Sequence, residues 1–307
     1  MIVVDGNLPE NIHFKWSKAN KPIIHIPQRE EVRLTLPDCS VNQVKESWTT
    51  NDLNKLDTSK LDGAVGPLFV EGAEPGCTLE VEILKIQTAT WGYSVTDEHY
   101  GLLKGKFENN LTIWDLKEGY AEPRSNFPKG IRVPINPFLG VMGVAPDVGE
   151  FGMIAPQRFG GNMDNKLLTA GSRLYLPILI RGGLFSAGDP HAAQGDGESG
   201  GTGLETRAIA TLRFNVIKDV RIDYPRAIVN QSSNSYIMTM GISDDLYKAS
   251  EIAMANMVDE LKTRGISGGE AYVLCSLVGD LRISELVDEP NHVVSMTFPL
   301  RHVPGHS

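Results

Sequence analysis

The sequence has few of the features that mark several large classes of protein. Its three cysteines, Cys39, Cys77 and Cys275, are far apart and odd in number, so they form no disulfide framework. The longest apolar runs, such as residues 174–180, are much too short to cross a bilayer. The first residues lack a basic segment followed by an apolar core, so we expect no signal peptide. These absences predict a soluble protein of the reducing cytoplasm.

Positive charge is also scarce. The chain has 29 Lys and Arg against 38 Asp and Glu, a net charge of −9, and no basic cluster. Such a surface repels nucleic acid and anionic membranes, so we expect neither as a partner. With 307 residues and 41% hydrophobic side chains, the chain can bury a large core without covalent staples.

The pattern of apolar residues favours a mainly β protein. Alternation or short buried runs predict strands at 31–36, 77–86, 173–180, 206–217, 235–241 and 292–300. From residue 88 to 171 the chain is rich in Gly and Pro, and its apolar content predicts an ordered loop system rather than disorder.

Helical signals concentrate near the C-terminus. Apolar residues at spacings of three or four predict a helix over about 244–264, which Gly265 ends. Ser267 and Glu270 form a capping-box pattern that opens a second helix, about 268–280, which we expect to be more thoroughly buried. The predicted fold class is mainly β, with β-sandwich or barrel-like sheets and an α+β C-terminal portion that carries these two helices.

The same pattern suggests three parts along the chain. We expect an N-terminal β-rich domain over 1–130 and a central β-rich region over 131–225 that carries the functional loop. A C-terminal α/β portion follows over 226–307.

The stretch GDPHAAQGDGESGGTGLE, residues 188–205, crowds titratable side chains onto a flexible backbone. Asp189 and His191 are two residues apart, as are Asp196 and Glu198, so each pair faces one side if the chain is extended. We predict that Asp189, His191 and Asp196 bind a divalent metal. A mixed imidazole and carboxylate set suits Zn²⁺ best, and a neighbouring Ca²⁺ site is an additional expectation. Glu198 is the candidate general base for a water molecule.

Other interpretations of this loop stay open. Asp and Gly crowd together in turns, and His191 could simply cap a carbonyl. Ser186 with Asp189 and His191 could form a catalytic triad, although no nucleophile-elbow motif is present. A dinucleotide site is excluded, because the acidic residues inside GDGESG would repel pyrophosphate and no helix follows it.

A second polar pair lies in GGNMD, residues 160–164. Asn162 and Asp164 alternate onto one face, and with Glu198 they complete the candidate catalytic set. A turn with a left-handed Asn explains the same pattern. The sequence leaves the roles of His13, His25 and Glu71 open.

Several segments of the chain resemble those of a known protein family. The run GLFSAGDPHAAQGDGE, residues 183–198, resembles the hallmark of the acetamidase/formamidase family. Further family-like blocks follow in the expected order at 66–84, 135–146, 159–178 and 271–288. The sequence departs from the pattern at Ser199-Gly200, Gly203 and Cys77, and these departures bear on the shape of the pocket and on the preferred amide.

The resemblance implies a metal-associated amidohydrolase that cleaves the C–N bond of short amides, such as formamide and acetamide, to a carboxylate and ammonia. It also implies a β-rich fold and assembly into a dimer or a larger homo-oligomer. Two alternatives remain: a hydrolase of the same fold that acts on another C–N substrate, and a non-catalytic β-rich protein that binds a metal or ligand.

Overall fold

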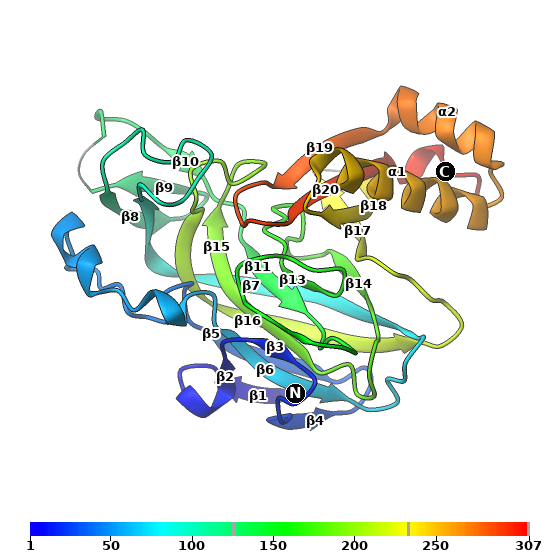
Figure 1. Cartoon of the computed structure of the whole chain (residues 1–307), viewed down its shortest axis with the longest axis horizontal. Helices are drawn as coiled ribbons and strands as arrows, with labels where there is room; N and C mark the ends of the chain where they lie inside the picture. The colour runs from blue at the N-terminus through cyan, green and yellow to red at the C-terminus, as the bar shows by residue number, and fades with distance from the viewer. Residues whose placement is uncertain (125–126, 232–233, 306–307) are drawn as a thin grey trace.

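The computed structural model describes residues 1–124, 127–231 and 234–305 (Figure 1). The first strands are β1 (Ile2–Asp5), β2 (Ile12–His13), β3 (Trp16–Ser17), β4 (Ile24–Ile26), β5 (Glu31–Leu36), β6 (Ala64–Val70), β7 (Thr78–Thr96), β8 (Asn110–Lys117), β9 (Tyr120–Pro123) and β10 (Val133–Pro134). They are followed by β11 (Phe138–Gly143), β12 (Glu150–Phe151), β13 (Gly160–Asn162), β14 (Arg173–Pro177), β15 (Phe185–Ala193), β16 (Leu204–Ile217), β17 (Arg226–Gln231), β18 (Asn234–Ser243), β19 (Asp280–Glu285) and β20 (His292–Pro299). The helices are α1 (Leu246–Thr263) and α2 (Gly268–Val278).

The predicted fold class is confirmed, because the chain is mainly β with two helices near its C-terminus (Figure 1). Strand β16 illustrates why alternation is a reliable signal. Its even-numbered residues from Ala208 to Val216 are buried, and the residues between them are partly exposed. One face of the strand therefore belongs to the core and the other to the surface.

Strands β15 and β16 lie where several parts of the sheet meet. Strand β15 pairs antiparallel with β6, β11 and β16, and β16 also pairs with β5 and β7. Eight of the nine residues of β15 are buried, which agrees with its position between other strands. The turn between β15 and β16, predicted to carry the functional residues, is thus anchored at both ends by the sheet.

The C-terminal part forms its own layer. Strands β17, β18, β20 and β19 pair antiparallel in that order, and α1 packs on β18 and β20 (Figure 1). Helix α1 buries one stripe, Ala249, Ala253, Met257 and Leu261, at helical spacing. Its first turn is capped by Asp245, whose side chain accepts a hydrogen bond from the Lys248 backbone amide at 2.7 Å.

The expectation that α2 is thoroughly buried is wrong. The capping box of Ser267 and Glu270 is present, but only Ala271 and Cys275 of the helix are buried. Tyr272, Val273 and Leu277 are exposed. Because α2 packs mainly on α1 at the edge of the molecule, only one narrow side of it meets the core (Figure 1).

The middle of the chain contains more regular structure than its composition suggests. Strand β7 continues to Thr96, and β8, β9 and β11 lie inside the region predicted to be loops. Glycine is compatible with these strands where backbones approach closely. A Cβ atom at Gly160 would lie 2.4 Å from the carbonyl oxygen of Met142 on the neighbouring strand.

The main hydrophobic core includes residues from all three predicted parts, for example Val4, Leu139 and Val293. A separate cluster lies beneath α1 and α2. The three-part division therefore stays a prediction. Among the residues that the structure describes, no helix combines the length and apolar character needed to cross a membrane.

Candidate metal centre and its pocket

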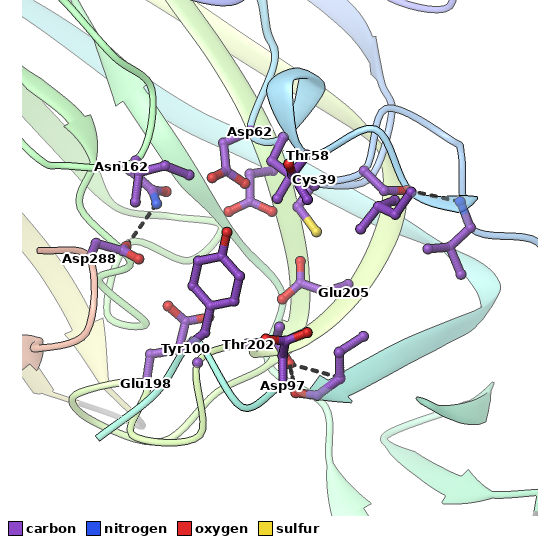
Figure 2. A pocket seen from close by; sticks show the side chains of 18 of the residues that line it. Cys39, Thr58, Asp62, Asp97, Tyr100, Asn162, Glu198, Thr202, Glu205 and Asp288 are labelled. Atoms are coloured by element: carbon purple, nitrogen blue, oxygen red, sulfur yellow. Dashed lines mark hydrogen bonds between the residues drawn. The ribbon is translucent and has the colours of Figure 1, made fainter. Parts of the chain in front are cut away.

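A cavity of about 150 Å³ lies where β15 and β16 meet the long connection between β5 and β6. Figure 2 shows Asp62, Glu198, Glu205 and Asp288 reaching toward one space from different sides, with the ring of Tyr100 between them. The acidic residues that line the cavity are Asp62, Asp97, Asp164, Asp189, Glu198, Glu205 and Asp288. These side chains come from segments far apart in the sequence, so folding alone concentrates them.

Among the described residues that line the cavity, His191 is the only basic one. It lies on β15 directly opposite Glu205 on β16. Its Nε2 atom is 2.9 Å from Oε2 of Glu205 and 3.2 Å from Oδ1 of Asp189. The edge of Phe138 packs on the imidazole, with ring centroids 5.0 Å apart, and helps to fix its orientation.

Asp164 approaches the other nitrogen of the same imidazole. Its Oδ1 atom lies 3.5 Å from Nδ1 of His191. Gly140 makes this approach possible, because a Cβ atom there would lie 2.4 Å from Oδ1 of Asp164 and 2.5 Å from Oδ2 of Asp189. The missing side chain at position 140 leaves room for both carboxylates.

Several buried atoms of this cluster have at most an ion-pair contact within it and make no hydrogen bond of favourable geometry. They are both carboxylate oxygens of Asp164, Oδ1 of Asp189, Nδ1 of His191 and Oε2 of Glu205. Buried polar groups in proteins almost always have partners, so this concentration indicates a site for something that binds acceptors. Ligand-type atoms converge within 4.8 Å in two groups, Asp164 with His191 and Glu198, and Cys39 with Asp189 and Glu205.

The protonation of the cluster follows from its burial. Burial, together with the negative charge of Asp164, raises the pKa of Glu198 well above its ordinary value. Burial also raises the pKa of Glu205 to about 7, although His191 opposes this. Burial alone would lower the pKa of His191, but the charges of Asp189 and Glu205 outweigh it and raise that pKa well above 6.5. The raised pKa values mean that the clustered carboxyl groups hold protons more tightly than exposed ones, and a bound divalent cation would take the place of such protons.

The predicted catalytic residues Glu198, Asn162 and Asp164 all line the cavity. Glu198 lies in the turn after β15 with a positive φ of 45°, and 7% of its surface is exposed. The side-chain amide of Asn162 donates a hydrogen bond to Oδ2 of Asp288 at 2.8 Å. Its own oxygen stays buried and unpaired. Sequence reasoning therefore identified three residues that the fold does bring together.

Asp196 lies outside this cluster, although the i, i+2 spacing predicted that it would join Asp189 and His191. Its Oδ2 atom accepts a hydrogen bond from Arg282 at 2.6 Å, and its Oδ1 atom is 3.3 Å from Nζ of Lys166. The expectation assumed an extended chain, but β15 ends at Ala193 and the chain then turns. Glu198 consequently points inward and Asp196 outward.

The triad alternative has no geometric support. Ser186 is fully buried, and its Oγ atom is hydrogen-bonded to Nε2 of His13 at 2.8 Å, not to His191. His25 is exposed and stacks on Phe69, with ring centroids 4.3 Å apart. Glu71 is exposed in a turn. Neither His25 nor Glu71 lines the cavity.

Sequence reasoning missed four acidic residues that line the cavity, Asp62, Asp97, Glu205 and Asp288. It also missed Glu285, whose Oε1 atom accepts a hydrogen bond from the backbone amide of Asp288 at 2.6 Å. Burial raises the pKa of Glu285 to about 8, and one of its oxygens is buried without a partner. Glu205 is hidden from pattern analysis because the strand pairing shifts between Thr206 and Ala208, so the burial alternation breaks beside it. The feature of the sequence that could have identified Glu205 is its position at the end of the acidic Gly-rich stretch. Asp62 and Asp288 are isolated carboxylates with no local motif.

These features define a β-rich protein with a buried acidic and histidine-containing site that suits a divalent cation beside a small cavity. The profile of the "Acetamidase/Formamidase family" matches residues 5–151 and 149–302. The chain therefore belongs to the acetamidase/formamidase family, and it is an amidase that acts on linear-amide C–N bonds.

Known relatives cover nearly the whole chain. It is similar to a formamidase from Methylophilus methylotrophus, 27% identical over 365 residues, which covers 94% of this chain and 88% of the relative. An acetamidase from Mycolicibacterium smegmatis is 23% identical over 343 residues, with 85% and 84% covered. The crystal structure of an acetamidase from Bacillus halodurans superposes with a TM-score of 0.89 at 29% identity and covers 100% of both chains.

Proposed function

We propose that this amidase is a metal-dependent hydrolase of short-chain amides, which it converts to a carboxylate and ammonia. Formamide and acetamide are the simplest candidates. The observation that carries the proposal is the buried cluster around His191, whose unpaired ligand atoms border a small cavity next to Glu198. Relatives named formamidase and acetamidase support the choice of substrate.

The residues of the cluster fit a divalent cation. His191, Asp164 and Asp189 would hold it, because all three offer buried atoms without hydrogen-bond partners. Glu205 adjoins the same imidazole. One imidazole with several carboxylates suits Zn²⁺, and the oxygen-only surroundings farther from His191 suit Ca²⁺ as an additional ion. When bound, the cation would supply Lewis-acid activation of water and of the amide carbonyl. We leave Asp196 out of the ligand set, since Arg282 and Lys166 already neutralise it.

Glu198 is our candidate for proton transfer. Its buried carboxylate lines the cavity and lies in the group that includes Asp164 and His191, so it is placed to exchange a proton with a water molecule or amide there. It would take the proton from the attacking water and deliver it to the departing nitrogen. Asn162 and Asp288 line the cavity next to each other (Figure 2), where their oxygen atoms can accept hydrogen bonds from the amide NH₂ group.

Two further parts of the proposal concern the whole molecule. We propose a homo-oligomer, a dimer or larger, and a cytoplasmic location. Light scattering on the purified protein tests the first, and fractionation of cells that make the protein tests the second.

The proposed activity is tested by ammonia release from formamide and acetamide before and after chelation. We expect chelation to abolish turnover, and addition of Zn²⁺, or of another single divalent cation, to restore it. The variant His191→Ala should contain less metal per chain than the wild type. Full turnover after complete removal of metal would contradict metal dependence, and no turnover of any amide by the metal-loaded protein would contradict the activity itself.

A further inference from the structure

The cavity has two unlike halves, and the proposed function uses only one of them. The acidic half surrounds His191. The other half is apolar, and most of it comes from the long connection between β5 and β6, residues 37–63, which we call the β5–β6 excursion. The apolar side chains that line this half include Val44, Leu53, Leu56, Leu61 and Val95. Formamide carries no carbon chain that could contact such a wall.

The apolar wall, formed by the five side chains named above, packs on a hydrophobic cluster of its own. Val44 belongs to a satellite hydrophobic cluster with Tyr93 and Leu111, and Leu53 and Leu56 pack against that cluster. The excursion is held in shape by a capping box in which Thr49 and Asp52 bond to each other. The wall is therefore supported by its own hydrophobic cluster and by the capping box.

The size of the cavity exceeds the needs of the smallest amides. Its volume of about 150 Å³ is similar to that of an engineered apolar cavity that accepts benzene. Acetamide has only about four heavy atoms, so it would leave much of the apolar wall in contact with water, which is unfavourable. A substrate that covers this wall would gain affinity from each buried methylene group.

The orientation of such a substrate follows from the polar groups. Glu198 belongs with Asp164 and His191, whereas Cys39 belongs with Asp189 and Glu205. In Figure 2, Glu198 and Cys39 lie on different sides of the space into which Glu205 points. The apolar wall adjoins the Cys39 side. The nitrogen, which needs the proton from Glu198, therefore faces away from the wall, and the acyl group faces toward it.

We propose that the preferred substrates are primary amides whose acyl group is an apolar chain of about four to six carbons, with Leu53 and Leu56 as specificity-determining residues. This inference rests on the proposed amidase function. It goes beyond that function by naming the part of the substrate that the β5–β6 excursion recognises.

The test is the specificity constant kcat/KM of the metal-loaded protein for formamide, acetamide, butanamide, pentanamide, hexanamide and octanamide. We expect kcat/KM to rise about fourfold for each methylene between acetamide and pentanamide, the factor for burying one such group. The larger side chain of Leu56→Trp should occupy the apolar half of the cavity. In this variant the ratio of kcat/KM for hexanamide to kcat/KM for acetamide should fall at least about tenfold. Leu56→Ala should move the highest kcat/KM to amides with longer acyl chains. This second variant tests the inference if the Trp variant does not fold.

Leu116→Trp is the matched control, because Leu116 is also partly buried but does not line the cavity. Leu116→Trp should keep the wild-type ratio of kcat/KM for hexanamide to kcat/KM for acetamide. Turnover that is fastest for formamide and falls with chain length would overturn the acyl-chain inference and leave the amidase function intact. A higher kcat/KM for N-butylformamide than for pentanamide would overturn it too, because the wall would then serve the amine side. No turnover of any amide would overturn the proposed function, and this inference with it.

Discussion

At the scale of single residues, the site is defined by charge that the protein itself does not balance. His191 lies between Asp164 on one side and Asp189 and Glu205 on the other, all of them buried. Such an arrangement costs free energy unless a partner neutralises it. The divalent cation that we propose would offset this cost.

A histidine outside the cavity gives a prediction about stability. Burial lowers the pKa of His13 from its ordinary 6.5 to about 4. Between these two values the unfolded chain binds the proton and the folded chain does not. The free energy of unfolding should therefore fall as the pH drops from 6.5 toward 4, by up to about 3 kcal/mol for this residue. Urea unfolding at pH 7 and pH 4.5 measures the change, which should be smaller in His13→Gln.

His99→Gln is the control for that measurement, because His99 is exposed on the surface. It should lose stability with pH as the wild type does. If His13→Gln and the wild type lost the same amount of stability, the partly buried His13 would not be the source of the pH dependence.

At the scale of elements, periodic sequence patterns predict strands and helices, but they do not predict where the chain turns. Regular alternation located β5 and most of β16, and the capping box located the start of α2. Asp189, His191 and Glu198 were also recognisable, because one Gly-rich stretch holds them together. The position of Asp196 was predicted wrongly for the same reason, because the i, i+2 spacing assumes an extended chain. The chain instead turns after Ala193, and Asp196 accepts a hydrogen bond from Arg282.

Helix α2 provides a prediction at this scale. Cys275 is one of its two buried residues, and burial raises the pKa of its thiol to about 11, so the thiol is protonated at neutral pH. Cys275→Ala should lower the free energy of unfolding by about 1 kcal/mol through a small cavity. The rate of ammonia release per folded molecule should not change. Loss of turnover in a variant that folds normally would indicate a thiol mechanism that the structure does not suggest.

At the scale of the whole molecule, the cavity beside His191 is a product of topology. Its wall combines the β5–β6 excursion, the β15–β16 turn and Asp288 near the C-terminus. No local pattern links Asp62 to Asp288, because only the completed fold brings the two chain regions to one cavity. This is why sequence reasoning found the centre of the site and missed much of its rim.

The proposed mechanism assigns proton transfer beside a bound cation to Glu198. The most direct measurement is metal content and kcat on the same sample of Glu198→Gln, which keeps the size of the side chain but cannot accept a proton. We predict metal content and folding like those of the wild type, with kcat for ammonia release lower by ~10²–10⁴-fold. Loss of metal together with activity would make Glu198 a ligand instead. Near-normal turnover with full metal would contradict both roles.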